Sequence, residues 1–220
     1  DVVELNGLLA EASVDIGYLS ETTEFGFTPL VRRRTYSGDP EFDATDIVAR
    51  MRYQFETVKS TWSIDGQFTQ LPVRNAERAD DDLDITDPED IPDDDSGLVQ
   101  LGGDRDRLVL RPRWTYRWSD VSSTTLEIDY RDVSYDETFV FLRPYTDTTV
   151  RANYGYGFSQ RTSGFIEASV RNYEDEASNE FDANGINVGL NTRLSETLML
   201  RARIGAENVE SAVTGVSETQ

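Results

Sequence analysis

Hydrophobic and polar residues alternate along this chain with a period of two, most clearly between residues 185 and 207. Ile186, Val188 and Leu190 are separated by polar or small residues, and the alternation resumes at Leu198 after a short turn. An α-helix cannot produce this period, whereas a β-strand with two different faces does. Each arm is about 10 residues long, roughly what a tilted strand needs to cross the hydrocarbon layer of a membrane. We therefore predict a hairpin of two membrane-crossing strands.

The same alternation predicts seven further strands, which gives nine in all. They cover residues 8–19, 46–56, 61–70, 107–118, 124–135, 147–158 and 163–173. The segment 20–43 contains Pro29 and three consecutive arginines, and we predict an exposed loop there, with a short extra strand at 25–31 as the alternative. Pro112 lacks an N–H group inside a predicted strand, so we expect a β-bulge at this residue.

The connections between the predicted strands differ in length. Short turns at 55–61, 118–124, 158–164 and 194–200 alternate with longer loops that are acidic or contain proline. This asymmetry is typical of outer-membrane β-barrels. Outward aromatic residues precede three of the four short turns and predict an interfacial girdle on that side. They are Tyr53 and Phe55; Trp114, Tyr116 and Trp118; and Tyr154, Tyr156 and Phe158.

The predicted fold is all-β, an antiparallel up-and-down transmembrane β-barrel in a single domain over residues 1–220. Closed bacterial barrels normally have an even number of strands. Because we count nine, and because residues 213–220 look like the beginning of a loop, we expect this chain to be part of a larger barrel that is incomplete at the C-terminal end. A soluble β-sandwich is the alternative, but it would have to bury the aromatic face and expose the rows of arginine.

Composition removes several classes of function. The formal net charge of −21 argues against a nucleic-acid partner. Cysteine and histidine are absent and Lys59 is the only lysine, which excludes Ser-His-Asp and Cys-His nucleophiles, His/Cys zinc sites and Walker lysines. A glycosidase with paired carboxylates stays open in principle, although no pair stands out among 42 acidic residues. We expect no enzyme, no catalytic residue and no cofactor.

The longest predicted interruption is the acidic segment 71–105, which we expect to be a solvated extracellular loop because its like charges cannot pack into a core. Asp80, Asp82 and Asp84 have the first spacings of an EF-hand loop and make a weak calcium candidate. Ile85 stands where that loop needs Gly, and Ile91 where it needs Glu. An EF-hand is therefore not predicted, and no other metal site is.

The turns 158–163 (Phe-Ser-Gln-Arg-Thr-Ser) and 194–197 (Leu-Ser-Glu-Thr), each between alternating strands, resemble those of the β-barrel porin type 2 family. The resemblance extends from about residue 8 to residue 210, and its motifs are short. It implies an outer-membrane barrel of the kind found with exopolysaccharide biosynthesis and export systems. The family has no catalytic residues to transfer to this chain.

If the alternation is right, the inward face is rich in arginine. The predicted lumen residues are Arg50, Arg52, Arg111, Arg113, Arg117, Arg151, Arg171, Arg193, Arg201 and Arg203, accompanied by Asp46, Asp65, Glu127, Asp129, Glu167 and Glu207. The planar arginine fork binds carboxylate, sulfate or phosphate, so such a surface suits the passage of an anionic polymer. The alternative is that the arginines pair with the carboxylates and only brace the wall.

Taken together, these patterns predict a porin-like channel of the bacterial outer membrane that exports or passes a polysaccharide, with an anionic one favoured. The expected partners are membrane lipid, the polysaccharide and periplasmic export proteins that dock on the short turns. The alternative is a non-transporting structural or adhesive surface β-protein that binds through its acidic loops.

Overall fold

The computed structural model describes residues 6–37, 43–73, 103–136, 142–177 and 179–213. They form one antiparallel β-sheet of 11 strands. The strands are β1 (Asn6–Ser13), β2 (Ile16–Leu19), β3 (Thr23–Ser37), β4 (Ala44–Glu56), β5 (Ser60–Pro72), β6 (Asp104–Ser119), β7 (Ser122–Tyr135), β8 (Tyr145–Gly157), β9 (Thr162–Asp175), β10 (Asn179–Arg193) and β11 (Met199–Val213). Among these residues, no helix is long and apolar enough to cross a membrane.

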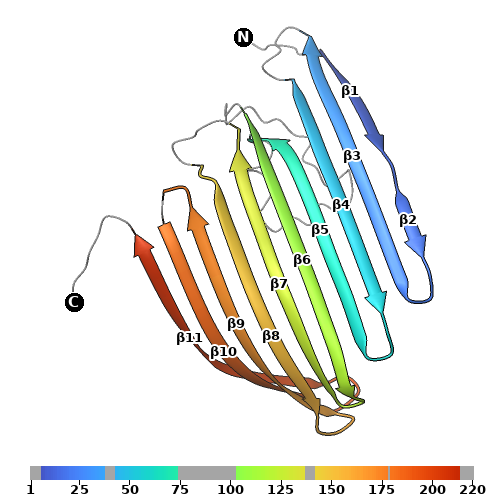
Figure 1. Cartoon of the computed structure of the whole chain (residues 1–220), viewed down its shortest axis with the longest axis vertical. Coiled ribbons are helices and arrows are strands. Elements are labelled where there is room, and N and C mark those ends of the chain that lie inside the picture. Colours follow the sequence, from blue (N-terminus) through green and yellow to red (C-terminus); the bar gives the residue numbers. More distant parts are fainter. Residues whose placement is uncertain (1–5, 38–42, 74–102, 137–141, 178, 214–220) are drawn as a thin grey trace.

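Each strand from β3 onward pairs with the next one along the chain, and β1 and β2 both pair with β3 (Figure 1). The all-β, antiparallel, up-and-down arrangement predicted from the sequence is therefore confirmed, and the described residues contain no second sheet of a sandwich. The sheet is open, with β1 and β2 at one edge and β11 at the other. The four short turns predicted from the sequence lie at the same end of the sheet (Figure 1), whereas the connection from β9, which ends at Asp175, to β10, which begins at Asn179, is equally short and lies at the other end.

The prediction of an exposed loop over residues 20–43 is wrong, because β3 occupies most of it. Phe25 and Phe27 continue the apolar alternation and pair with Tyr53 and Met51 of β4. Pro29 is tolerated because its backbone faces the edge: the N–H of Val14 donates to the Pro29 carbonyl at 3.2 Å. Pro29 has no backbone N–H group and so donates no hydrogen bond to the edge strand. The edge strand breaks at that point into β1 and β2, which keep the same register on β3.

The predicted bulge at Pro112 is also wrong. The pairs Leu110–Tyr130 and Arg113–Glu127 keep one register across the proline, and the irregularity lies next to the turn, between Arg117 and Ser119. The strands β3 to β11 have 13 to 16 residues rather than about 10. They extend past the apolar positions, mainly at the long-loop end, which is why alternation of hydrophobicity alone underestimated them.

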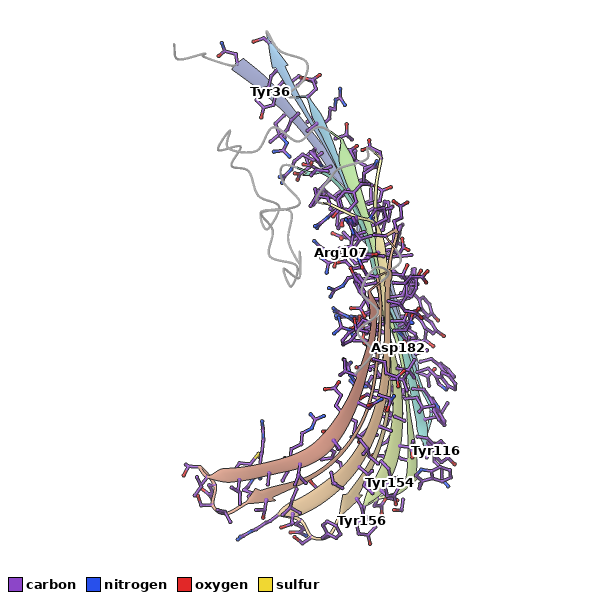
Figure 2. The ribbon with its side chains drawn as sticks, turned by 90° about the vertical axis from the view of Figure 1, so that its left-hand side faces the viewer. Tyr36, Arg107, Tyr116, Tyr154, Tyr156 and Asp182 are labelled. Atoms are coloured by element: carbon purple, nitrogen blue, oxygen red, sulfur yellow. The ribbon has the colours of Figure 1, made fainter. Side chains whose placement is uncertain are left out.

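The sheet is curved, with a polar concave face and an apolar convex face (Figure 2). Arg107 lies on the concave face, while Tyr116, Tyr154 and Tyr156 lie on the convex face (Figure 2). Large apolar side chains of the convex face remain in contact with solvent, for example Ile166 at 50% and Ile186 at 55% exposure. A small buried cluster of Leu30, Val48 and Leu71 is the hydrophobic core of the described residues. An exposed apolar face this large requires a nonpolar surrounding.

Candidate functional site

All ten arginines predicted to face the lumen lie on the concave face. The register shows this directly, because Glu127 on β7 pairs with Arg113 on β6 and with Arg151 on β8. Alternation then assigns the remaining arginines to the same face. The ten arginines on this face span 153 positions of the sequence, from Arg50 to Arg203.

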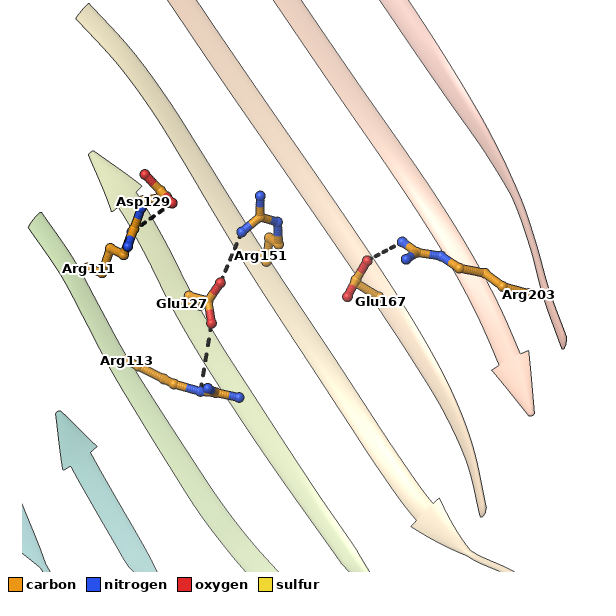
Figure 3. Close-up of polar contacts among 7 residues, drawn as sticks. All are labelled: Arg111, Arg113, Glu127, Asp129, Arg151, Glu167 and Arg203. Atoms are coloured by element: carbon orange, nitrogen blue, oxygen red, sulfur yellow. Dashed lines mark hydrogen bonds and ion pairs between the residues drawn. The ribbon is translucent and has the colours of Figure 1, made fainter. Parts of the chain in front are cut away.

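The centre of the concave face is a network of cross-strand ion pairs (Figure 3). Glu127 Oε1 accepts from Arg151 Nη1 at 2.9 Å, and its Oε2 lies 3.7 Å from Arg113 Nε. Arg111 Nε donates to Asp129 Oδ2 at 3.3 Å, and Arg203 Nη2 to Glu167 Oε1 at 2.5 Å. Positive and negative groups therefore alternate across neighbouring strands.

Three more of the predicted arginines have carboxylate partners. Arg52 Nε lies 2.9 Å from Asp65 Oδ1, and Arg117 Nη2 lies 3.3 Å from Glu56 Oε1. Arg171 binds both oxygens of Asp147, each at 2.9 Å. Because seven of the ten arginines are paired in this way, much of the positive charge on this face is compensated.

The other three arginines differ from one another. Arg50 also has an interaction partner. Arg193 and Arg201 have no carboxylate within 4.0 Å in the described part of the chain, and both are exposed. They lie at the short-turn end, on β10 and β11.

The predicted lumen residues leave out five arginines that lie on the same face: Arg32, Arg34, Arg105, Arg107 and Arg131. Arg34 Nη2 binds both oxygens of Asp46, at 3.0 and 2.8 Å, and Asp46 is fully buried. Arg32 Nε donates to Glu11 Oε2 at 2.8 Å. The alternation that begins at Phe25 would have placed Arg32 and Arg34 had it been continued past Val31.

The concave face is hollowed in several places. A hollow of about 360 Å³ in the middle is lined by paired charges and small side chains, among them Arg151, Ser169 and Ala183. A larger one of about 920 Å³ lies toward the short turns and includes Arg117, Asn153, Glu167 and Arg203. Glycine, serine and asparagine predominate in its lining, so this part of the surface offers hydrogen-bonding groups with little bulk.

The convex face has the predicted aromatic belt at the short-turn end. The ring centroids of Trp62 and Trp114 are 5.5 Å apart, and those of Tyr116 and Trp118 are 4.6 Å apart. The indole N–H groups are satisfied, because Trp114 donates to Ser60 Oγ and Trp118 to Thr124 Oγ1, each at 2.8 Å. Aromatic residues with one polar and one apolar end suit the boundary between lipid and water.

The calcium candidate of Asp80, Asp82 and Asp84 lies outside the described residues, as does most of the predicted acidic loop 71–105. Its ends do belong to the sheet, since β5 runs to Pro72 and β6 begins at Asp104. Within the described ranges, no group of three or more His, Cys, Asp or Glu side chains is arranged to hold a metal ion.

No protein-family model matches the chain, and no curated protein matches it in sequence. The resemblance to the β-barrel porin type 2 family is thus not confirmed. Solved structures do match. OmpT of Vibrio cholerae with loop L8 deleted, an outer membrane protein, has a TM-score of 0.57 and 9% identity over 90% of this chain and 57% of its own.

In-vitro folded OmpT of Vibrio cholerae gives a TM-score of 0.57 and 10% identity, covering 90% of this chain and 53% of that one. The chain thus spans little more than half the length of these two proteins. A CymD monoaromatic hydrocarbon channel has a TM-score of 0.40 and 11% identity, over 94% of this chain and 72% of that one, which does not establish a shared fold. The sheet described here has the fold of an outer-membrane β-barrel, and the likeness supports the expected location in the bacterial outer membrane.

Proposed function

We propose that this chain contributes the wall of an outer-membrane channel for hydrophilic solutes. The observation that carries the proposal is the division of one continuous sheet into an apolar convex face and a charged concave face (Figure 2), and the concave face is also hollowed. In a membrane the first face contacts lipid and the second lines water. Both edges of the sheet, β1 with β2 on one side and β11 on the other, must pair with a strand before the backbone groups there are satisfied inside a bilayer.

The solute class that we propose is a polysaccharide, with an anionic one preferred. The support is chemical: sugars need many hydrogen-bonding partners, and arginines bind acidic groups. The ion pairs limit the proposed preference for an anionic polysaccharide. Because seven predicted lumen arginines already have carboxylate partners, preference for an anion depends on the arginines that do not.

The first experiment asks whether the protein is a membrane barrel. The full chain, extracted in detergent, is compared with and without heating by gel migration, and its solubility is tested without detergent. A heat-dependent shift together with a strict need for detergent supports the proposal. A soluble monomer with no heat shift contradicts it and leaves the non-transporting surface protein as the function to test.

The second experiment addresses the solute. Conductance of the protein in planar bilayers is recorded while an anionic polysaccharide or a neutral one of matched length is added from either side. We expect both to block the current, with the anionic polymer blocking at lower concentration. Conductance without any block by polysaccharide would contradict this solute class while leaving the channel itself in place.

A further inference from the structure

The pairing of arginine with carboxylate fails where the short turns join β8 to β9 and β10 to β11. Arg161, in the turn that leads into β9, and Arg193, the last residue of β10, line the same hollow, and the Arg193 N–H donates to the Arg161 carbonyl at 2.8 Å. In the adjacent row, Arg201 pairs with Asn191. None of the three guanidinium groups has a carboxylate partner within the described residues, and Arg201 Nε donates only to Met199 Sδ, at 3.3 Å. We call these three residues the rim arginines.

Without a bound anion, the uncompensated positive charge of the rim arginines is unfavourable. Arg161 and Arg193 line one hollow, and two like charges close to each other repel, whereas opposite charges attract. The chain does not lack acidic residues, since it has 42 of them against 21 basic ones. Arg203, two residues from Arg201 on the same strand, is paired with Glu167. The excess of positive charge at the rim is therefore local and set by the choice of residues there.

The surroundings of the rim arginines supply further polar groups. A hollow of about 190 Å³ is lined by Arg161 and Arg193 together with Ser159, Ser163 and Asn191. Hydroxyl and amide groups next to two guanidinium forks form a suitable environment for an oxyanion. All three arginines are exposed, so bound anions remain partly hydrated and affinity stays low.

We propose that the rim arginines bind the phosphate, sulfate or carboxylate group of a solute at the short-turn mouth of the concave face. Binding there relieves the repulsion between Arg161 and Arg193, and it concentrates acidic solutes at one end of the surface. The proposed function gives this site its biological role. The binding itself does not depend on transport and can be measured without it.

The test uses the full chain folded in a zwitterionic detergent, with inorganic phosphate as the probe and isothermal titration calorimetry as the readout. The rim variant is R161Q/R193Q. The control is R33Q/R143Q, which removes the same charge: Arg33 lies beside Thr45 and Asp43, and Arg143 lies 4.0 Å from Asp175. We expect the dissociation constant for phosphate to rise at least tenfold in the rim variant and less than twofold in the control.

Equal weakening in both variants, or no phosphate binding to the unaltered chain, would overturn the proposal. Heat-dependent gel migration of each variant shows whether it has folded. Vesicles containing an anionic phospholipid form a separate arm, and displacement of phosphate by these vesicles would assign the site to lipid headgroups instead. If conductance is absent while the rim variant alone loses phosphate binding, the site stands and the channel proposal falls.

Discussion

Glu127 lies between two guanidinium groups at the centre of the concave face, 2.9 Å from Arg151 and 3.7 Å from Arg113. We expect E127Q to leave both arginines uncompensated and to shift ion selectivity toward anions. The loss of stability should be small, about 0.5–1 kcal/mol, because exposed ion pairs contribute little. Reversal potentials in a salt gradient measure the selectivity.

Glu180 supplies the control for that measurement, because it lies on the convex face opposite Glu174. E180Q removes the same charge and should leave the reversal potential where it was. A shift of similar size in both variants would show that net charge, rather than the pairing of Glu127, determines selectivity.

Asp104 and Asp106 at the long-loop end of β6 are close to Asp136. Burial, and then the negative charge of Asp136, raise the pKa of both carboxyl groups above the ordinary value. A carboxyl group whose pKa is higher in the folded than in the unfolded state costs stability while it is ionised, and this cost disappears as the pH falls through the raised pKa.

We therefore expect D104N to raise the unfolding temperature at neutral pH and to have no effect once the pH is low enough to protonate Asp104 in the parent protein. The Asp104 backbone N–H, which donates to Asp136 Oδ1 at 2.6 Å, is unaffected by the change. Thermal unfolding of both proteins in detergent across acidic and neutral pH gives the comparison. If D104N raised the unfolding temperature by the same amount at acidic and neutral pH, the raised pKa of Asp104 would not be the cause.

Single residues also show what the sequence can and cannot predict about the site. The two-residue period was enough to put Arg111, Arg151 and Arg203 on one face, because the period is a property of each strand alone. Which carboxylate each arginine meets depends on the register between strands, and register depends on turns and on pairing. The pattern therefore gave the pairing of arginine with carboxylate only as an alternative, and it could not identify which residues pair.

Strands β9 and β10 are joined by an aromatic contact on the concave face. Gly189 pairs with Phe165, whose ring covers the glycine so closely that a Cβ added at Gly189 would clash with Phe165 Cε1 and Cζ. An aromatic side chain over a cross-strand glycine fills the space that the missing side chain leaves. The pair is therefore expected to act as one unit.

We expect G189A to destabilise the protein by about 1 kcal/mol, because the ring must move and lose its packing against the backbone. In an F165A background the same change should cost little, so the two substitutions should not be additive. A double-mutant cycle of urea unfolding in detergent measures this coupling. Additive effects would mean that the ring does not stabilise the strand pair.

The strand β3 explains why one element escaped prediction. Proline and a run of arginines usually indicate a loop, and both occur between Phe25 and Ser37. Here Pro29 turns its nitrogen toward the edge strand, where β1 and β2 break, and the arginines at 32 and 34 point to a polar face. Local composition was overridden by the pairing of β3 with β4 along 12 positions.

At the scale of the whole molecule, β3 changes the organisation of the sheet. With it, β1 and β2 together occupy the first of ten successive positions and β11 the last. With β3 in place, every strand from β3 to β10 lies next to the strand that follows it in the sequence, as in a regular up-and-down sheet (Figure 1). The general architecture was predictable because it rests on the alternation summed over many strands, so one misassigned segment did not change it.

The positions of the tryptophans have an optical consequence. The chain has three tryptophans, and all of them, Trp62, Trp114 and Trp118, lie on the convex face near the short turns. Indole emission from this protein therefore reports one depth in the membrane. In vesicles made with brominated lipids, quenching should be strong when bromine is placed near the headgroups and weak when it is placed at the bilayer midplane. Strong midplane quenching would mean that the sheet sits differently in the bilayer.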